Sequence, residues 1–524
     1  MTGSKSRFYL KGACLLILSA GLVCQVFLFL SRWHFQAGVR HLAFDRYDEA
    51  IPEFETALKI IPGWMPGLVA GQDRFRIYSY TGKAHYEKGR QIWREKGISR
   101  QVFEEYSTAM SFLKQADLMD PDTYINTYRM ALTGDVLETL SKKKGQNPED
   151  AWDADLLYQK ATRLRPNGIS IHQTHARYLY RKKEHSAVRD LAGKMVRIFP
   201  QIYGNLKQEP YFTEDLLAVL EPGLEEALAK GIQPREALRA LSDINVRKLE
   251  MDKALSFYAR SLEIRSYGNP ENDYLHMGRL YLKAEKFDDS HSWFEKVLTL
   301  SKDPETSVRN IFNIHKAERK IDEFIRFAMK TEAAVPLPAL HMAIAEAFMD
   351  LKQYAIAKSR LLRFTDQTPD ARAYYLLARI AETEKDWDRM ELSSQKATSL
   401  DRENSNYHLL LSRSLSAQKK FQGAEEAATL AIRYAKKEQP WLFDHRAWTR
   451  WSQKKYNDAA QDWKRAFSLK PEQASFAFNV ARAYHQAGNF PEALAYIKTA
   501  LKLDPDKPEY QQLESVLSRI EPVK

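Results

Sequence analysis

The chain has 524 residues, a length that suits either three or four domains or one extended repeat array. Hydrophobic residues make up 44% and charged residues 28%, so a wholly disordered chain is excluded. The net charge of +11 is spread along the chain without a dense basic run, which argues against a nucleic-acid-binding protein. The only cysteines, Cys14 and Cys24, exclude a disulfide framework and a cysteine-based zinc site in the body of the chain.

The first predicted element is an apolar segment, residues 12–30, that contains no charged side chain. As a helix it would be about 28 Å long, close to the thickness of the hydrocarbon core of a bilayer. The residues after Leu30 offer no small-x-small cleavage site, which favours an uncleaved signal anchor over the alternative, a cleaved signal peptide. The sequence therefore predicts a transmembrane helix at 12–30.

The charges that flank this segment predict its orientation. Three basic side chains precede it and two follow it, so the positive-inside rule places residues 1–11 in the cytoplasm and the body outside. A body without cysteine suits an oxidising compartment. We therefore expect a single-pass protein of the bacterial inner membrane with a periplasmic body; a body that faces the cytoplasm remains the open alternative.

The body of the chain shows pairs of short amphipathic helices. In the clearest segment, 474–507, a first helix carries Ala481, Gly488 ends it, and a second helix carries Ala493 and Ala500. Small residues at these positions allow two helices to approach closely, where a larger side chain would overpack. The pattern predicts a helix hairpin.

The same pattern of small and large apolar residues at helical spacing recurs upstream. The positions are Ala447 and Trp463, Ala424 and Ala431, Ala378 and Ala397, Ala357 and Leu361, Gly278 and Phe294, Ala254 and Tyr258, Ala154 and Tyr158, and Gly38 and Phe54. With closing prolines such as Pro471 and Pro505, this pattern resembles the tetratricopeptide repeat (TPR) family. The resemblance implies an all-α, right-handed superhelical solenoid of about twelve TPR-like helix hairpins, preceded by the transmembrane helix.

The repeats suggest a division of the body. We expect an N-terminal TPR-like array at 31–202, a helical insertion or linker with three prolines at 203–234, and a C-terminal TPR array at 235–507. Residues 508–524 read as a capping helix and tail, which a solenoid needs because its last repeat would otherwise expose an apolar face.

The sequence contains no catalytic motif. It lacks a nucleophile elbow, a phosphate-binding loop, a dinucleotide fingerprint and a His-Glu-x-x-His zinc motif, so we expect a protein that is not an enzyme and has no cofactor. His172 and His175 lie three apart on one helical face, but no carboxylate ligand is nearby, so no metal site is predicted.

The candidate binding residues lie in the first helices, which line the concave groove in TPR proteins. Arginine directly follows the small residue of the first helix in several hairpins: Arg177, Arg279, Arg379, Arg413 and Arg482. Trp448 takes this position between the last two, and Trp441 and Trp451 share its side of the helix. In one interpretation the arginines only pack their aliphatic chains on the helix surface and keep their guanidinium groups in water. In the other, arginine and tryptophan form a groove for an acidic or aromatic-rich ligand.

The resemblance implies a scaffold that binds other proteins. We expect a membrane-anchored TPR scaffold or adaptor for protein–protein interactions in the bacterial envelope, serving secretion or polysaccharide export. The partner would be a protein or peptide of acidic character, and not a nucleic acid. The alternative is a carbohydrate-binding or enzyme-regulating subunit of an envelope polysaccharide machine, because indoles also stack on the faces of sugars in a glycan.

Overall fold

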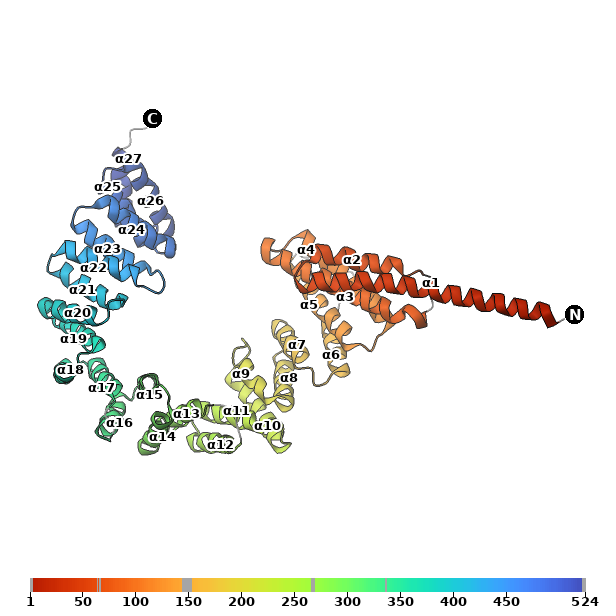
Figure 1. The fold of residues 1–524 in the computed structure, drawn as a ribbon, viewed down its shortest axis with the longest axis horizontal. Coiled ribbons are helices and arrows are strands. Elements are labelled where there is room, and N and C mark those ends of the chain that lie inside the picture. Colours follow the sequence, from red (N-terminus) through yellow and green to blue (C-terminus); the bar gives the residue numbers. More distant parts are fainter. Residues whose placement is uncertain are drawn as a thin grey trace. The chain divides into compact units, whose positions relative to one another are not determined.

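The computed structural model describes residues 3–63, 65, 67–143, 153–264, 269–334 and 337–520, and the side chains of residues 3–20, 67–69, 142, 143 and 520 lie outside the described part. All regular structure in these residues is helical, with 27 α-helices and one short 3-10 helix (Figure 1). The chain divides into two compact units, Met1–Ser266 and Tyr267–Lys524. This division falls inside the range 235–507 that the sequence suggested as one array.

The first unit consists of helix hairpins with one irregular segment. Its helices are α1 (Gly3–Ala43), α2 (Tyr47–Ile60), α3 (Gly67–Lys96), α4 (Arg100–Met119), α5 (Tyr124–Lys143), α6 (Ala154–Leu164), α7 (Ile169–Arg181), α8 (His185–Ile198), η1 (Pro200–Ile202), α9 (Tyr203–Leu206), α10 (Glu214–Ala229), α11 (Pro234–Arg247) and α12 (Met251–Glu263). The segment predicted as an insertion forms α9 and α10, and α10 packs against both α8 and α11.

The second unit is a regular series of hairpins that ends with a single helix. Its helices are α13 (Glu271–Lys283), α14 (Phe287–Leu300), α15 (Pro304–Ala317), α16 (Ile321–Ala334), α17 (Pro338–Asp350), α18 (Tyr354–Gln367), α19 (Ala371–Glu384), α20 (Trp387–Leu400), α21 (Ser405–Ala417), α22 (Phe421–Arg433), α23 (Pro440–Ser452), α24 (Tyr456–Leu469), α25 (Ala474–Gln486), α26 (Phe490–Leu503) and α27 (Pro508–Ile520). Tyr510 and Leu517 of α27 are buried against the last hairpin.

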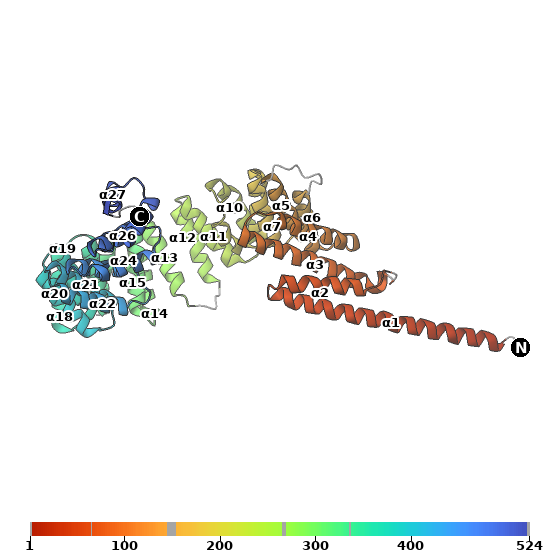
Figure 2. The same cartoon turned by 90° about the horizontal axis from the view of Figure 1, so that it is seen from above.

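The predicted transmembrane helix at 12–30 requires correction. No helix in the described part of the chain is long and apolar enough to span a membrane. The segment forms part of α1, whose C-terminal half lies beside α2 while its N-terminal part continues beyond it (Figure 2). Within the segment, Cys24, Phe27 and Leu28 pack on the core of the first hairpin. The finding overturns both the transmembrane helix and the single-pass inner-membrane location.

Close packing between the two helices of a hairpin follows the predicted small residues. Ala481, Ala493 and Ala500 are all fully buried in one cluster between α25 and α26, which confirms the predicted contact. The glycine positions are tighter still. A Cβ atom added to Gly38 would lie 2.6 Å from the ring of Phe54, and one added to Gly278 would lie 2.4 Å from the ring of Phe294.

Gly278→Ala should destabilise the second unit by about 1–3 kcal/mol, because its methyl group would force the fully buried ring of Phe294 to move. The control is Gly423→Ala in α22, where the nearest side-chain atom would be 3.4 Å away. There alanine should stabilise by about 0.5–1 kcal/mol through helix propensity. Urea denaturation of both variants measures the difference, and equal effects would contradict the close approach at Gly278.

The turn inside most hairpins contains one residue in the left-handed conformation. These residues, with φ between 57° and 81°, are Asp45, Lys183, Leu249, Glu285, Arg319, Lys352, Lys385, Lys419, Lys454 and Gly488. The next N–H group closes the turn on a carbonyl of the first helix, as Lys420 does on Leu415 at 2.8 Å. This hydrogen-bond pattern ends many helices, and its left-handed position is usually occupied by glycine. Here nine of the ten left-handed positions are occupied by other residues.

Candidate partner-binding face

The first helices of the hairpins in the second unit form a row, which we call the first-helix face. From α13 to α21, ion pairs bridge neighbouring first helices. The pairs are Arg279 with Glu318 at 2.6 Å, Lys316 with Asp350 at 2.7 Å, Arg372 with Glu346 at 2.8 Å, and Arg413 with Glu382 at 2.8 Å. Such partly exposed pairs stabilise by about 1 kcal/mol or less. These pairs neutralise four of the cations on this part of the face, whereas Arg379 of α19 lies 6.0 Å from the ring centre of Tyr375.

The pattern changes between α23 and α25, where an arginine lies on indoles instead of pairing with a carboxylate. The guanidinium of Arg482 is 5.7 Å from the ring centre of Trp448, 5.0 Å from that of Trp451 and 5.5 Å from that of Phe478. Among the described residues, no carboxylate forms an ion pair with Arg482. Its hydrogen-bond donors are therefore held in place by aromatic rings and remain available to a ligand.

The tryptophans around Arg482 differ sharply in exposure. Trp463 of α24 is only 1% exposed, packs edge-on against Trp448 with 5.1 Å between ring centres, and donates its Nε1 hydrogen to Asp444 at 2.7 Å. In contrast, Trp448 is 40% exposed and Trp441 is 45% exposed. Trp463 is thus a core residue, while the other two present apolar surface to solvent. We call Trp441, Trp448, Trp451 and Arg482 the Trp–Arg patch.

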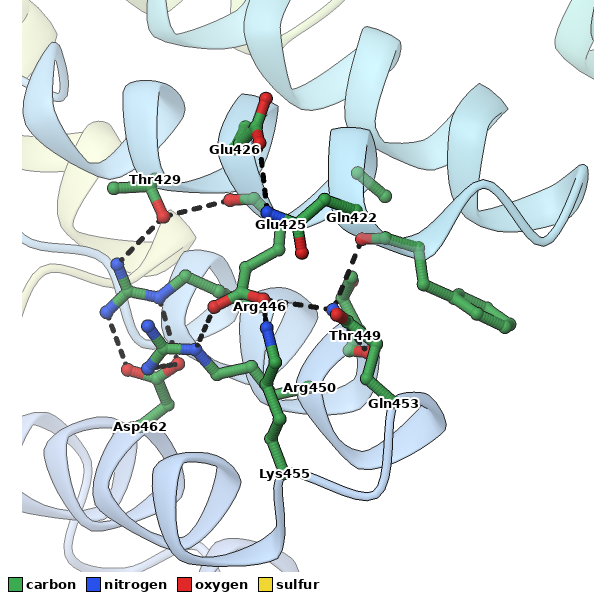
Figure 3. Close-up of polar contacts among 12 residues, drawn as sticks. Gln422, Glu425, Glu426, Thr429, Arg446, Thr449, Arg450, Gln453, Lys455 and Asp462 are labelled. Carbon is green, nitrogen blue, oxygen red and sulfur yellow. Dashed lines mark hydrogen bonds and ion pairs between the residues drawn. The ribbon is translucent and has the colours of Figure 1, made fainter.

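Helix α23, which carries the patch tryptophans, is held by a polar network on its other side (Figure 3). Arg446 and Arg450 of α23 both bind the carboxylate of Asp462 in α24, at 2.6 and 2.9 Å. Arg450 also binds Glu425 of α22 at 2.9 Å, and Lys455 binds the same carboxylate at 2.7 Å. The network links three consecutive helices and fixes the rotation of α23, so the exposed indoles are pre-positioned.

Two titratable groups packed around α23 have strongly shifted pKa values. Burial opposes ionisation of Glu425, but hydrogen bonds from Lys455, Arg450 and Gln453 outweigh it and lower its pKa to about 2. Burial and the nearby Arg413 lower the pKa of His445 to about 4. His445 contacts Ser412 of α21 at 2.9 Å, so a neutral histidine joins these two first helices.

The structure brings only some of the predicted site residues together. Trp448, Trp451 and Arg482 are in contact, and Trp441 is exposed on the same helix. The other predicted arginines lie elsewhere. Arg413 forms an ion pair with Glu382, and Arg279 forms one with Glu318. The guanidinium of Arg379 is 6.0 Å from the ring centre of Tyr375. Arg177 belongs to the first unit and pairs with Glu209 at 2.5 Å.

Sequence reasoning missed Asp444 as a neighbour of the patch and Phe478 as a contact of Arg482. The spacing could have indicated both, since Asp444 precedes Trp448 by four residues and Phe478 precedes Arg482 by four. The predicted histidine pair has structural contacts: His172 binds the carbonyl of Pro166 at 2.7 Å and His175 binds Asp155 at 2.6 Å. In the described part of the chain, no group of three or more metal-ligating side chains could hold an ion.

Family models of the tetratricopeptide repeat match residues 342–389 and 450–517, and the second match contains Trp451 and Arg482. These two segments of the chain are tetratricopeptide repeats. TPR repeats bind protein or peptide partners, so the chain is a scaffold for protein–protein interaction. No curated protein matches the chain in sequence.

Several solved structures resemble the chain weakly. YrrB, a TPR protein with an unusual peptide-binding site, is 14% identical with a TM-score of 0.34, covering 36% of this chain and 97% of its own. The Cut9–Hcn1 complex of the APC/C is 13% identical with a TM-score of 0.33, covering 93% and 96%. A TPR protein from Parabacteroides merdae is 11% identical with a TM-score of 0.30, covering 48% and 100%. At these scores the likenesses carry no conclusion about the partner.

Proposed function

We propose that the Trp–Arg patch binds an extended segment of a partner protein that carries an acidic residue and a large apolar residue. The observation that supports this most is Arg482, whose guanidinium lies on two indoles without a carboxylate partner among the described residues. An acidic side chain of the partner would complete this arrangement with a charge-assisted hydrogen bond.

The composition of the patch supports the same conclusion. Tryptophan and arginine are the residue types that most often dominate binding energy at protein interfaces. Trp441 and Trp448 expose apolar surface that a partner's side chain could cover. The ion pairs of Arg446 and Arg450 hold α23 in place. Binding therefore loses little conformational entropy of the patch, which favours affinity.

A glycan is a weaker candidate for this patch. Sugars stack on open indole faces, whereas the guanidinium of Arg482 already lies over Trp448 and Trp451. The predicted roles in secretion or polysaccharide export depended on the membrane anchor and are not carried forward. That the protein acts by binding and not by catalysis remains a prediction.

Trp448→Ala should weaken binding of a selected partner peptide by about thirtyfold, since a central interface tryptophan contributes about 2 kcal/mol. The melting temperature should fall only slightly, because much of the side chain is in solvent. Peptides selected from a random twelve-residue display library on the immobilised chain provide the ligand, and calorimetry measures the affinity. The control is Trp293→Ala in α14, which removes a tryptophan packed on Tyr274, away from the patch.

Two outcomes would withdraw the proposal. Peptide affinity that is unchanged by both Trp448→Ala and Arg482→Gln would place binding elsewhere on the chain. A loss of about 3–5 kcal/mol in the free energy of unfolding of Trp448→Ala would instead mark Trp448 as a core residue.

A further inference from the structure

The Trp–Arg patch adjoins a carboxylate as well as a cation. Asp444 follows Trp441 by three residues and precedes Trp448 by four, and residues at these spacings are neighbours on a helix surface. The hydrogen bond from Trp463 holds Oδ1 of Asp444 at 2.7 Å, at the edge of the aromatic cluster. The carboxylate is partly buried and lies beside the exposed indoles.

No basic side chain neutralises Asp444 within the residues that the structure describes. Burial raises the pKa of its carboxyl, and only the indole N–H groups of Trp463 and Trp448 act in the opposite direction. The neighbouring carboxylates differ: Glu425 binds Arg450 and Lys455, and Asp462 binds two arginines. A partly desolvated carboxylate without a cation gains more from an incoming basic group than a neutralised one does.

Asp444 and Arg482 both adjoin Trp448, yet they form no ion pair with each other in the described structure. The indole of Trp448 therefore has an unneutralised anion and an unneutralised cation beside it. A ligand with the opposite pattern of charges forms two new ion pairs here, whereas a ligand of one sign forms one and is repelled at the other.

We infer that Asp444 is a second contact site of the patch and binds a lysine or arginine side chain of the same partner segment whose carboxylate binds Arg482. This inference rests on the proposed function, since both contacts belong to one bound segment. The preferred segment then has mixed charge, with a basic and an acidic residue flanking an apolar residue that covers Trp448.

The experiment compares peptides selected from the random twelve-residue display library by four full-length proteins: wild type, Asp444→Asn, Arg482→Gln and Asp458→Asn. The amide in Asp444→Asn keeps an oxygen that accepts the Trp463 hydrogen bond, so the aromatic cluster should stay intact. Asp458→Asn removes the same charge from an exposed position on α24 and serves as the matched control.

Wild type and Asp458→Asn should select peptides enriched in both acidic and basic residues. Asp444→Asn should lose the basic enrichment and keep the acidic one, and Arg482→Gln should do the reverse. In the best wild-type peptide, replacing the basic residue by glutamine should weaken binding to wild type about tenfold and to Asp444→Asn less than twofold. The change on the peptide tests the wild-type protein directly, whether or not the variant folds.

The outcomes separate the inference from the proposed function. If wild type selects acidic peptides without basic enrichment, or if the glutamine peptide binds wild type equally well, the inference is wrong while the proposed function stands. If Arg482→Gln selects the same acidic peptides as wild type, or if wild type selects none, both are wrong.

Discussion

Replacing Asp462 by alanine should destabilise the second unit by about 3–5 kcal/mol, because two mostly buried arginines lose the carboxylate that they share. Asp462 is only 4% exposed and binds both Arg446 and Arg450 (Figure 3). Both arginine side chains are themselves mostly buried. Without Asp462 they remain as cations with one carboxylate, Glu425, to neutralise them, and that carboxylate already binds Lys455.

Hydrogen exchange and urea denaturation measure this effect. Because each repeat contacts mainly its neighbours, protection should be lost first in α22–α24. Asp458→Ala, which removes an exposed carboxylate of the same helix, should change stability by less than about 0.5 kcal/mol. A loss for Asp462→Ala no larger than that of the control would show that the network contributes nothing to holding α23.

Lowering the pH from 7 to 4 should destabilise the second unit, and His315 alone should account for up to about 3 kcal/mol. His315 of α15 is fully buried among Phe294, Phe324 and Phe327, with ring centres 5.1 to 6.3 Å away. Burial lowers its pKa from 6.5 to about 4. The unfolded chain therefore takes up the proton first, so the contribution is complete above about pH 6.5 and is lost as the pH falls toward 4.

His315→Phe should remove this part of the pH dependence, since phenylalanine suits the aromatic cluster and does not titrate. The pKa of His445 is also lowered to about 4, so it titrates in the same range. The difference between the wild-type and variant curves of unfolding free energy against pH therefore gives the contribution of His315 together with its coupling to His291, whose ring centre is 6.4 Å away and whose pKa burial also lowers. Parallel curves between pH 7 and 4 would contradict the assigned burial of this ring.

The hairpins could be predicted from sequence because they depend on local spacing. Gly278 and Phe294 lie within one repeat, and the contact between them follows from the chain itself. The arginine partners could not be predicted in this way. Arg413 and Arg482 occupy the same repeat position, yet one meets Glu382 of the preceding repeat and the other meets two indoles. Those contacts depend on how successive repeats stack.

The error at the N-terminus has a similar origin. An apolar run of bilayer length predicts a membrane span, but helical periodicity does not show which side chains face another helix. Leu28 and Cys24 pack against the first hairpin, and Ser31 just beyond them donates to the carbonyl of Ala57 at 2.8 Å. These contacts belong to tertiary structure, which the local pattern does not contain.

The left-handed turn residues have an evolutionary consequence. A residue with a side chain in this conformation is less stable than glycine by about 1 kcal/mol, and nine of the ten turn residues named above have a side chain. Since the turns are far apart, glycine substitutions at the others should act almost additively. Five of the strained residues are lysines: Lys183, Lys352, Lys385, Lys419 and Lys454. The array is thus less stable than the same fold would be with glycine at these turns. Selection could raise its melting temperature by single glycine substitutions, one repeat after another.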